Sequence, residues 1–199
     1  MASLRTFVAL ELEAAAIGQL TGVQAELQTL LHSMLGRGAN ALKPTRSHQM
    51  HMTLAFLGDT PMTSLDRIVA ILKDVSARHA SITMPAERVC YLRSSACATA
   101  VVISFNDESK RGAALARDLR ESLAPAGFEF ERRSFMAHVT LLRSRKGLRV
   151  PLDVPHVLRN ELGKVVLELH RIVYFASFLE ATGARYERLW AASLGTGPW

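Results

Sequence analysis

The amino-acid sequence predicts an α+β fold in which antiparallel strands are mixed with helices. Several short segments alternate apolar and polar side chains, as half-buried strands do. Three longer segments place apolar residues three and four positions apart, which is the spacing of amphipathic helices. The segments follow one another as strand, helix, strand, helix, strands, helix, strands. Because direct strand-to-strand connections occur beside helical ones, an α+β arrangement is favoured over a purely parallel sheet.

The first half of the chain contains the most regular of these patterns. Gly36 and Gly38 are expected to end the first helix, and Thr60 or Thr63 to cap the second. The predicted elements are a strand over 5–12, a helix over 14–34, a polar loop over 43–50, a strand over 51–57 and a helix ending near 79.

The second half is predicted to be richer in strands. Arg93, Ser94 and Ser95 are expected to form a tight hairpin between two strands, and Pro125 and Gly127 to end a helix. The predicted elements are strands over 82–92 and 96–105, a helix over 108–124, strands over 128–133 and 137–142, a loop over 144–160, and strands over 162–178 and 186–194.

Composition limits the classes of protein to consider. The 199 residues are 49% hydrophobic and 21% charged, which suits one globular domain or two small lobes, here taken as one domain over 1–199. No apolar stretch approaches the ~20 residues of a membrane helix, and the N-terminus lacks a signal-peptide core. Cys90 and Cys97 cannot form a disulfide framework and predict reduced, buried thiols in a cytoplasmic protein, a pairing across the hairpin being the alternative. The net charge of +6 fits an anionic partner or an ordinary solvated surface.

A four-residue pattern, His-x-Thr-Leu, occurs twice, starting at His51 and at His138. One copy would mean little, since a lone histidine in a strand is usually structural, but two matched copies favour function. Alternate residues of a strand share a face, so His51 lies beside Thr53, and His138 beside Thr140. The same alternation points Met52, Leu54 and Phe56 into the core. If the two halves are related by a pseudo-twofold axis, the two pairs face each other across a cleft.

Two histidines on opposite sides of one phosphorus atom suit general acid–base chemistry. Imidazole has an unperturbed pKa near ~6.5, so one ring can accept a proton from water while the other gives one to the leaving oxygen. The hydroxyls of Thr53 and Thr140 can donate hydrogen bonds to the phosphate oxygens. This scheme needs neither a metal nor a cofactor.

These motifs and their flanks resemble the 2H phosphoesterase superfamily, and most of all its bacterial RNA 2′,3′-cyclic phosphodiesterases, also called 2′-5′ RNA ligases. The resemblance spans nearly the whole chain. Its blocks start at Arg5 (RTFVAL), His51 (HMTLAFLG), Arg133 (RSFMAHVTL), Phe175 (FAS) and Gly183 (GARY). It implies a bilobal fold in which two pseudo-symmetric, interleaved lobes pack antiparallel sheets around a central cleft.

The resemblance also implies an activity and roles for the motif residues. It implies hydrolysis of RNA 2′,3′-cyclic phosphate ends to 2′-phosphomonoesters without metal, together with reversible 2′-5′ ligation. His51 would protonate the leaving 3′-oxygen, His138 would activate water, and Thr53 and Thr140 would bind the phosphate. Ala137 departs from the family, which has proline before the second histidine, and the loop over 43–50 lacks the family's usual aromatic residue.

Several further residues have both a functional and a structural interpretation. Basic residues after the second motif predict an RNA phosphate clamp or a solvated loop, and Arg143 reaches His138 only if the strand bulges or ends. Phe56 and Phe135 could each stack on a base, although strand alternation favours core packing for Phe56. His48 and His51 form only a weak metal-ligand pattern, so no metal is predicted. The RNA-binding candidates are Arg133, Phe135, Arg143, Arg145 and Lys146, with Arg149 in the same basic run.

Two functions of different kinds therefore remain open. The first is an enzyme acting on RNA or nucleotide cyclic phosphates, which is expected to be monomeric and to have no membrane partner. The alternative is a non-catalytic module that binds a nucleotide or an RNA end in the same cleft. The presence of both histidines and both threonines favours the enzyme, because binding alone does not need two acid–base groups.

Overall fold

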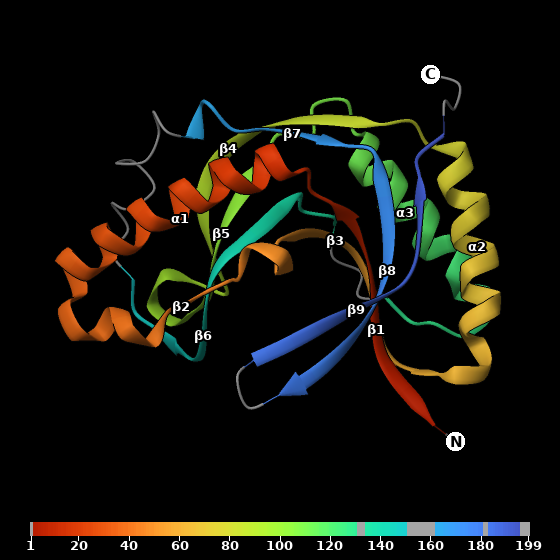
Figure 1. Ribbon diagram of the computed structural model, residues 1–199, viewed down its shortest axis with the longest axis horizontal. Helices are drawn as coiled ribbons and strands as arrows, with labels where there is room; N and C mark the ends of the chain where they lie inside the picture. Colours follow the sequence, from red (N-terminus) through yellow and green to blue (C-terminus); the bar gives the residue numbers. More distant parts are fainter. Residues whose placement is uncertain (1, 131–133, 151–161, 181–182, 196–199) are drawn as a thin grey trace.

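The computed structural model describes residues 2–130, 134–150, 162–180 and 183–195, and folds them into two antiparallel sheets with three α-helices (Figure 1). The first sheet has the strand order β3-β1-β8-β9, and the second has the order β2-β6-β5-β4-β7. The strands are β1 (Ser3–Glu11), β2 (Lys43–Pro44), β3 (His51–Pro61), β4 (Ile82–Leu92), β5 (Ala98–Phe105), β6 (His138–Leu148), β7 (Val166–Leu169), β8 (Arg171–Glu180) and β9 (Gly183–Ser193).

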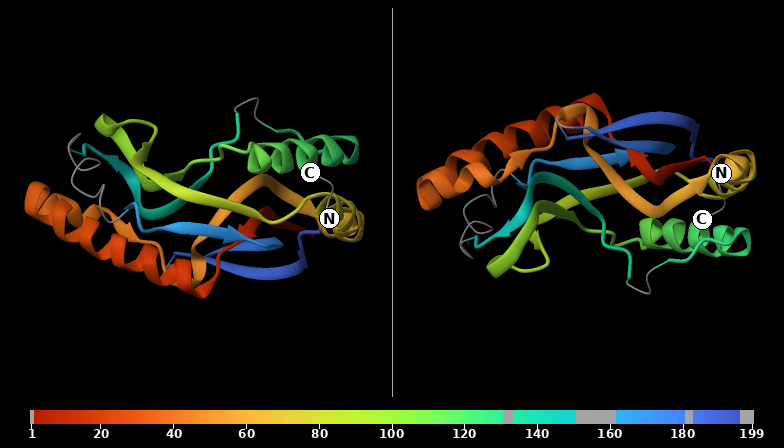
Figure 2. Two further views of the ribbon diagram at one scale, coloured as in Figure 1. Left: turned by 90° about the horizontal axis from the view of Figure 1, so that it is seen from above. Right: turned by 90° about the horizontal axis from the view of Figure 1, so that it is seen from below.

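Two of the helices pack on the sheet opposite to that of the strand before them. Helix α1 (Ala14–Leu35) follows β1 of the first sheet and precedes β2 of the second, and it packs on β6 and β7 of the second sheet. Helix α3 (Arg111–Leu123) connects two strands of the second sheet but packs on β3 of the first, beside α2 (Leu65–Arg78). Helix α1 lies at one end of the molecule and the pair α2 and α3 at the other (Figures 1 and 2). Helices α1 and α3 thus each follow a strand of one sheet and pack on the other sheet.

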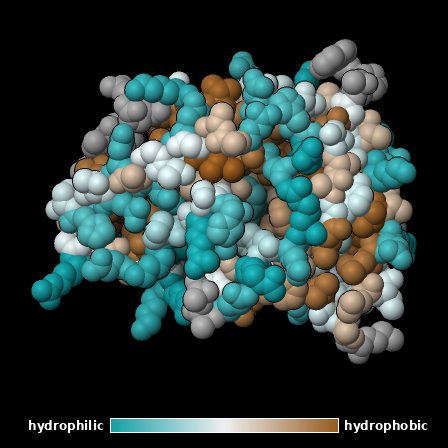
Figure 3. Space-filling view, in the orientation of Figure 1, coloured by the Kyte–Doolittle hydropathy of each residue, from teal (hydrophilic) through white to brown (hydrophobic). Residues whose placement is uncertain are grey.

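Burial follows the periodicity of the sequence. The apolar residues of each helix that lie three and four positions apart are buried, Leu20, Leu27 and Leu31 in α1 among them. Strand β5, which is central in its sheet, is buried along nearly its whole length. Hydrophilic side chains predominate on the surface shown in Figure 3, where hydrophobic ones form separate small groups. No helix of the described residues is long and apolar enough to cross a membrane.

Thr60 does not cap a helix. It lies inside β3, which continues past Gly58 to Pro61, and Ser64 precedes α2. Its hydroxyl is 2.7 Å from the Thr6 hydroxyl, which accepts a hydrogen bond of 3.1 Å from Tyr174. The three hydroxyls satisfy one another inside the first sheet, so an interior polar network competes successfully with the local capping signal.

Other boundaries differ where the chain makes an irregular connection. A left-handed residue at Arg93 and a 3-10 turn over Ser95–Cys97 replace the predicted tight hairpin. This turn leaves Cys97 exposed, so the expectation of a buried thiol is wrong there, and Cys90 is only partly buried; both cysteines are free. Strand β6 continues through residues 144–148, which were predicted to be loop.

The predicted late strand over 162–178 is two strands in different sheets. Strand β7 pairs with β4, and β8 pairs with β1, so the chain passes from one sheet to the other at His170. Residues 128–130 are not a strand, and the rest of that predicted strand, 131–133, lies outside the described residues. Most of the predicted loop over 144–160 lies outside them as well.

Candidate active site

The two His-x-Thr-Leu motifs begin β3 and β6, which belong to different sheets, and they meet at one cleft. The cleft has a volume of about 170 Å³. All four motif residues with polar side chains line it, together with residues from β4, from the segment between β2 and β3, and from further along β3 and β6. The lining residues are Thr45, Gln49, His51, Thr53, Phe56, Leu92, His138, Thr140 and Arg143.

A backbone carbonyl orients each imidazole in the same way. His51 Nδ1 lies 2.7 Å from the carbonyl oxygen of Gln49, and His138 Nδ1 lies 2.8 Å from that of Met136. A carbonyl can only accept, so Nδ1 carries the proton in both rings. In the neutral rings Nε2 is therefore the nitrogen that can accept a proton, which is what an acid–base role needs.

A β-bulge follows the threonine in both motifs. The register of β1 and β3 passes from Ala9–Thr53 to Val8–Ala55 and skips Leu54, and the register of β5 and β6 skips Leu141 in the same way. An extra residue reverses the alternation of faces beyond it. The fifth residue after each histidine, Phe56 or Arg143, consequently joins the histidine on the cleft face.

The two bulges correct the prediction for Phe56 and provide the bulge that Arg143 was expected to need. Phe56 was expected in the core, but its side chain is 64% exposed and lines the cleft. Arg143 was expected to need a bulge to reach the site, and it does line the cleft, with Nη2 3.4 Å from the Thr140 hydroxyl. Arg143 takes part in none of the ion pairs found among the described residues.

Side chains from α1 and α3 donate hydrogen bonds to the carbonyls of both bulges. Gln24 of α1 donates through Nε2 to the carbonyl oxygens of Leu141, at 2.7 Å, and Thr45, at 2.9 Å. Arg120 of α3 donates to the carbonyl oxygen of Leu54 at 3.4 Å. Each helix thereby fixes the motif of the sheet on which it packs, and Gln24 also ties the Thr45 segment to the second motif.

Burial makes both imidazoles weak bases. It lowers the pKa of His51 from 6.5 to about 4, and the nearby positive charge of Arg143 and a protonated His138 would lower it further, while the hydrogen bond to Gln49 opposes the change. Burial, with Arg143, also lowers the pKa of His138, against its hydrogen bond to Met136. Both rings are therefore neutral at pH 7 when no anion is bound.

The remaining candidate residues lie elsewhere or outside the described residues. Arg145 and Lys146 are exposed on β6, and Arg149 is exposed beyond its end; none of these residues lines the cleft. Phe135 packs against the core beside Gly112 of α3. Arg133 lies outside the described residues.

Four lining residues were not among the predicted site residues. Phe56 was identifiable, because it occupies the position in the first motif that Arg143 occupies in the second. Thr45 and Gln49 belong to the loop before the first motif, and Leu92, at the end of β4, carried no signal. The Thr45 hydroxyl is buried and has no hydrogen-bond partner among the described residues.

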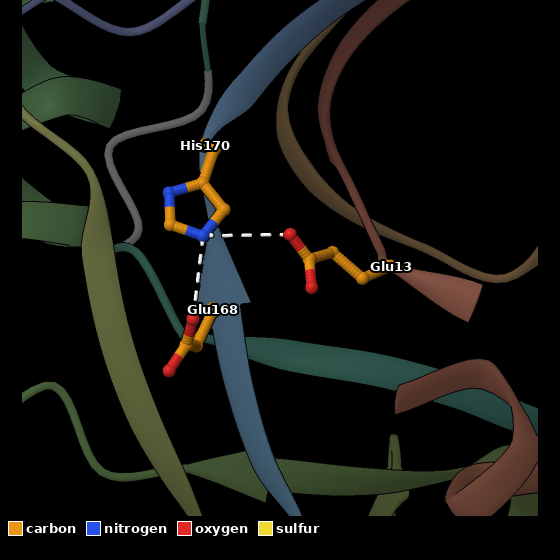
Figure 4. Close-up of side chains that lie close together, drawn as sticks. All are labelled: Glu13, Glu168 and His170. Carbon is orange, nitrogen blue, oxygen red and sulfur yellow. Dashed lines mark ion pairs between the residues drawn. The ribbon is translucent and has the colours of Figure 1, made fainter. Parts of the chain in front are cut away.

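A separate group of side chains has the composition of a metal site. Glu13 and Glu168 place carboxylate oxygens 3.5 and 3.4 Å from Nε2 of His170, at the point where the chain changes sheet (Figure 4). Within the described ranges, these three are the one such group close enough to share an ion. All three side chains are about half exposed, none lines the cleft, and their contacts are accounted for as surface ion pairs.

A protein family and a relative of known activity are similar in sequence to this chain. Residues 18–102, which include the first motif, match the family "LigT like Phosphoesterase". An RNA 2′,3′-cyclic phosphodiesterase of Geobacillus stearothermophilus is 29% identical over 151 residues, which are 74% of this chain and 46% of that protein. The chain thus spans about half the length of this curated relative.

Solved structures extend the likeness to the whole fold. Escherichia coli LigT in complex with 3′-AMP superposes with a TM-score of 0.75 over 97% of this chain and 99% of LigT, at 22% identity. The protein TT0787 of Thermus thermophilus gives a TM-score of 0.74 over 97% of this chain and 100% of that protein, at 20% identity. These likenesses confirm the predicted α+β fold with its antiparallel sheets.

Proposed function

We propose that this chain is a LigT-like phosphoesterase of the 2H superfamily and that it hydrolyses 2′,3′-cyclic phosphate ends of RNA to 2′-phosphomonoesters. The observation that carries the proposal is the convergence of the two imidazoles. Both rings line one cleft and use Nδ1 for a backbone carbonyl, which leaves Nε2 for proton transfer, and a threonine of each motif lines the same cleft. The relative from Geobacillus, named for this activity, supports the same choice of substrate.

The proposed reaction moves two protons. Nε2 of neutral His138 takes a proton from water as the water oxygen attacks phosphorus. The bond between phosphorus and the 3′-oxygen breaks, and the 3′-oxygen takes a proton from Nε2 of protonated His51. The assignment of acid to His51 and base to His138 follows the family. Thr53 and Thr140 donate hydrogen bonds to the non-bridging oxygens, and Arg143 stabilises their negative charge.

Binding of the substrate would itself favour the protonated form of His51. The scheme needs a protonated His51, whereas burial keeps this ring neutral in the empty cleft. A phosphate anion between the rings favours the charged form of imidazole and so raises its pKa. The site would therefore take up a proton as the phosphate enters.

The dimensions of the cleft suit the phosphate rather than the whole nucleotide. Its volume of about 170 Å³ is below the ~300–1,000 Å³ of typical ligand pockets. We place the cyclic phosphate between the histidines and the attached base at the mouth, beside the exposed ring of Phe56. A 5′-hydroxyl end entering in place of water would give a 2′-5′ bond, which is the ligation reaction.

Hydrolysis of 2′,3′-cyclic AMP and of an RNA oligonucleotide with a cyclic end tests the proposal. We expect a 2′-phosphate product, identified by ³¹P NMR, in the presence and absence of a chelator. His51→Ala and His138→Ala should each lower the rate by about 10²–10⁴-fold. His48→Ala is the matched control, because His48 is an exposed histidine of the preceding turn that does not line the cleft.

One outcome would count against the enzyme and another against its mechanism. Nucleotide binding without turnover by the unmodified protein would favour the non-catalytic binding module. Unchanged activity in either alanine variant would exclude the two-histidine mechanism while leaving the phosphoesterase activity itself in place.

A further inference from the structure

The two histidines, alike in sequence and in backbone contacts, differ in what packs around their rings. The His51 ring lies 4.9 Å from the Phe7 ring, at 33°, and 5.4 Å from the Tyr186 ring, at 81°. The Phe175 ring lies at 6.2 Å. Of the ring contacts in the described part of the chain, none involves His138. The pseudo-symmetry of the motifs is therefore broken by the first sheet.

The aromatic cluster around His51 is built on three neighbouring strands. Phe7 of β1 is 3% exposed and stands next to Phe175 of β8 in the register, with ring centroids 5.1 Å apart. Tyr186 of β9 meets Phe7 edge-on at 5.0 Å. Since Phe7 is fixed by the strands on both sides of it, the ring under His51 has little freedom to move.

Strand β9 is also linked to His51 through hydrogen bonds of Gln49. The side-chain amide of Gln49 donates to the carbonyl oxygen of Ala184, two residues before Tyr186. The backbone carbonyl of the same Gln49 accepts the hydrogen bond from His51 Nδ1. The strand thus holds both the edge of the imidazole and the segment that supplies its hydrogen-bond acceptor.

We propose that Tyr186 is a positioning residue, which presses its ring edge-on against His51, fixes the direction of Nε2 and keeps water from one side of the imidazole. His138 has no such partner among the described residues, so Tyr186 makes the two histidines chemically different. The catalytic consequence rests on the proposed function, whereas the effect on the His51 ring does not.

Replacing Tyr186 tests the aromatic contact without changing the charged groups around His51. Arg143 and His138 face the ring from the second sheet. Glu11, the register partner of His51 on β1, is held by ion pairs to Arg171 and Arg188. None of these groups is altered when Tyr186 is replaced, so a changed His51 reports the loss of the ring.

The test follows His51 and His138 directly by NMR titration of the protein labelled at histidine, with no substrate present. In Tyr186→Leu we expect the pKa of His51 to rise from about 4 toward 6.5 as water reaches the ring, and that of His138 to stay where it was. Tyr186→Phe keeps the edge contact and should titrate like the unmodified protein. Phe178→Leu is the matched control, because Phe178 lies on the same hairpin and its ring contacts Arg185 instead.

Kinetics provide a second readout. In Tyr186→Leu the limb of the kcat/KM profile governed by His51 should move to higher pH, whether His51 acts as acid or base, because its pKa rises in either case. We expect kcat to fall by roughly 10-fold to 100-fold with a smaller change in KM, and Tyr186→Phe to restore it.

Each outcome decides the proposal. A His51 titration that is unchanged in Tyr186→Leu, or that moves equally in Phe178→Leu, overturns it. If Tyr186→Leu does not fold, Tyr186→Met, which keeps more of the side-chain volume, takes its place under the same criteria. If the unmodified protein hydrolyses no cyclic phosphate, the proposed function fails, while the titration still decides the role of Tyr186.

Discussion

Replacing His51 by glutamine should make the protein less sensitive to acid. The pKa of His51 is about 4 in the folded protein and 6.5 in the unfolded chain. Between these values the unfolded chain binds a proton that the folded protein does not, so the free energy of unfolding falls as the pH falls. Integrated from pH 7 to pH 4.5, these two values give a loss of about 2.4 kcal/mol. Solvent screening of the partly exposed ring reduces the expected loss to about 1–2 kcal/mol.

Urea denaturation of both proteins at pH 7 and pH 4.5 measures this difference. The other titrating groups contribute alike to both proteins, so the contribution of His51 is the pH-dependent loss in the unmodified protein minus that in His51→Gln. His48→Gln controls for removal of an exposed histidine nearby. Equal losses in the unmodified protein and in His51→Gln would refute the conclusion that burial keeps His51 neutral.

Further predictions concern the anion, the second bulge and the interior of the first sheet. Phosphate binding should take up protons near pH 7, measured by calorimetry in buffers of different ionisation enthalpy, because the anion raises the pKa of the two histidines. Arg143→Gln should weaken phosphate binding by roughly 10-fold and reduce its salt dependence, measured by the same titration at several salt concentrations. Gln24→Leu should cost about 1–3 kcal/mol of unfolding free energy in urea denaturation, because it leaves the carbonyls of Leu141 and Thr45 with fewer donors. Thr60→Val should cost about 1–2 kcal/mol by the same measurement, because it removes a buried hydroxyl partner of Thr6.

The sequence was most informative about the site, because the two-residue period of a strand coincides there with a repeated motif. Each His-x-Thr pair shares a face of its strand for a local reason, and the structure brings both pairs to one cleft. The α+β fold could be predicted because the helical stripes and the strand alternation are strong in this chain. The sheet that each helix covers could not be predicted, because α1 and α3 each pack on the sheet opposite to that of the strand they follow.

Features missed from the sequence depend on partners that are distant in the chain. Leu54 and Leu141 become bulges only when they are paired with β1 and β5, so the exposure of Phe56 could not be deduced from alternation alone. The polarity of Thr60 indicated a cap because its partners, Thr6 and Tyr174, lie far away in sequence. The change of sheet at His170 interrupts a run of residues that looked like one strand.

The repeated backbone arrangement explains why the motif alone leaves the roles of the histidines open. Both histidines have the same carbonyl acceptor and the same bulge, so local geometry makes them equivalent. The difference arises one layer further out, where Phe7 and Tyr186 surround His51, while Arg143 lies beside Thr140 in the strand of His138. An acid and a base would need unequal environments. In this chain the difference lies in the aromatic packing around His51, because the positive charge of Arg143 lowers the pKa of both rings. A substitution in that outer layer should therefore separate the two roles more clearly than replacing either histidine, which removes the group and its environment together.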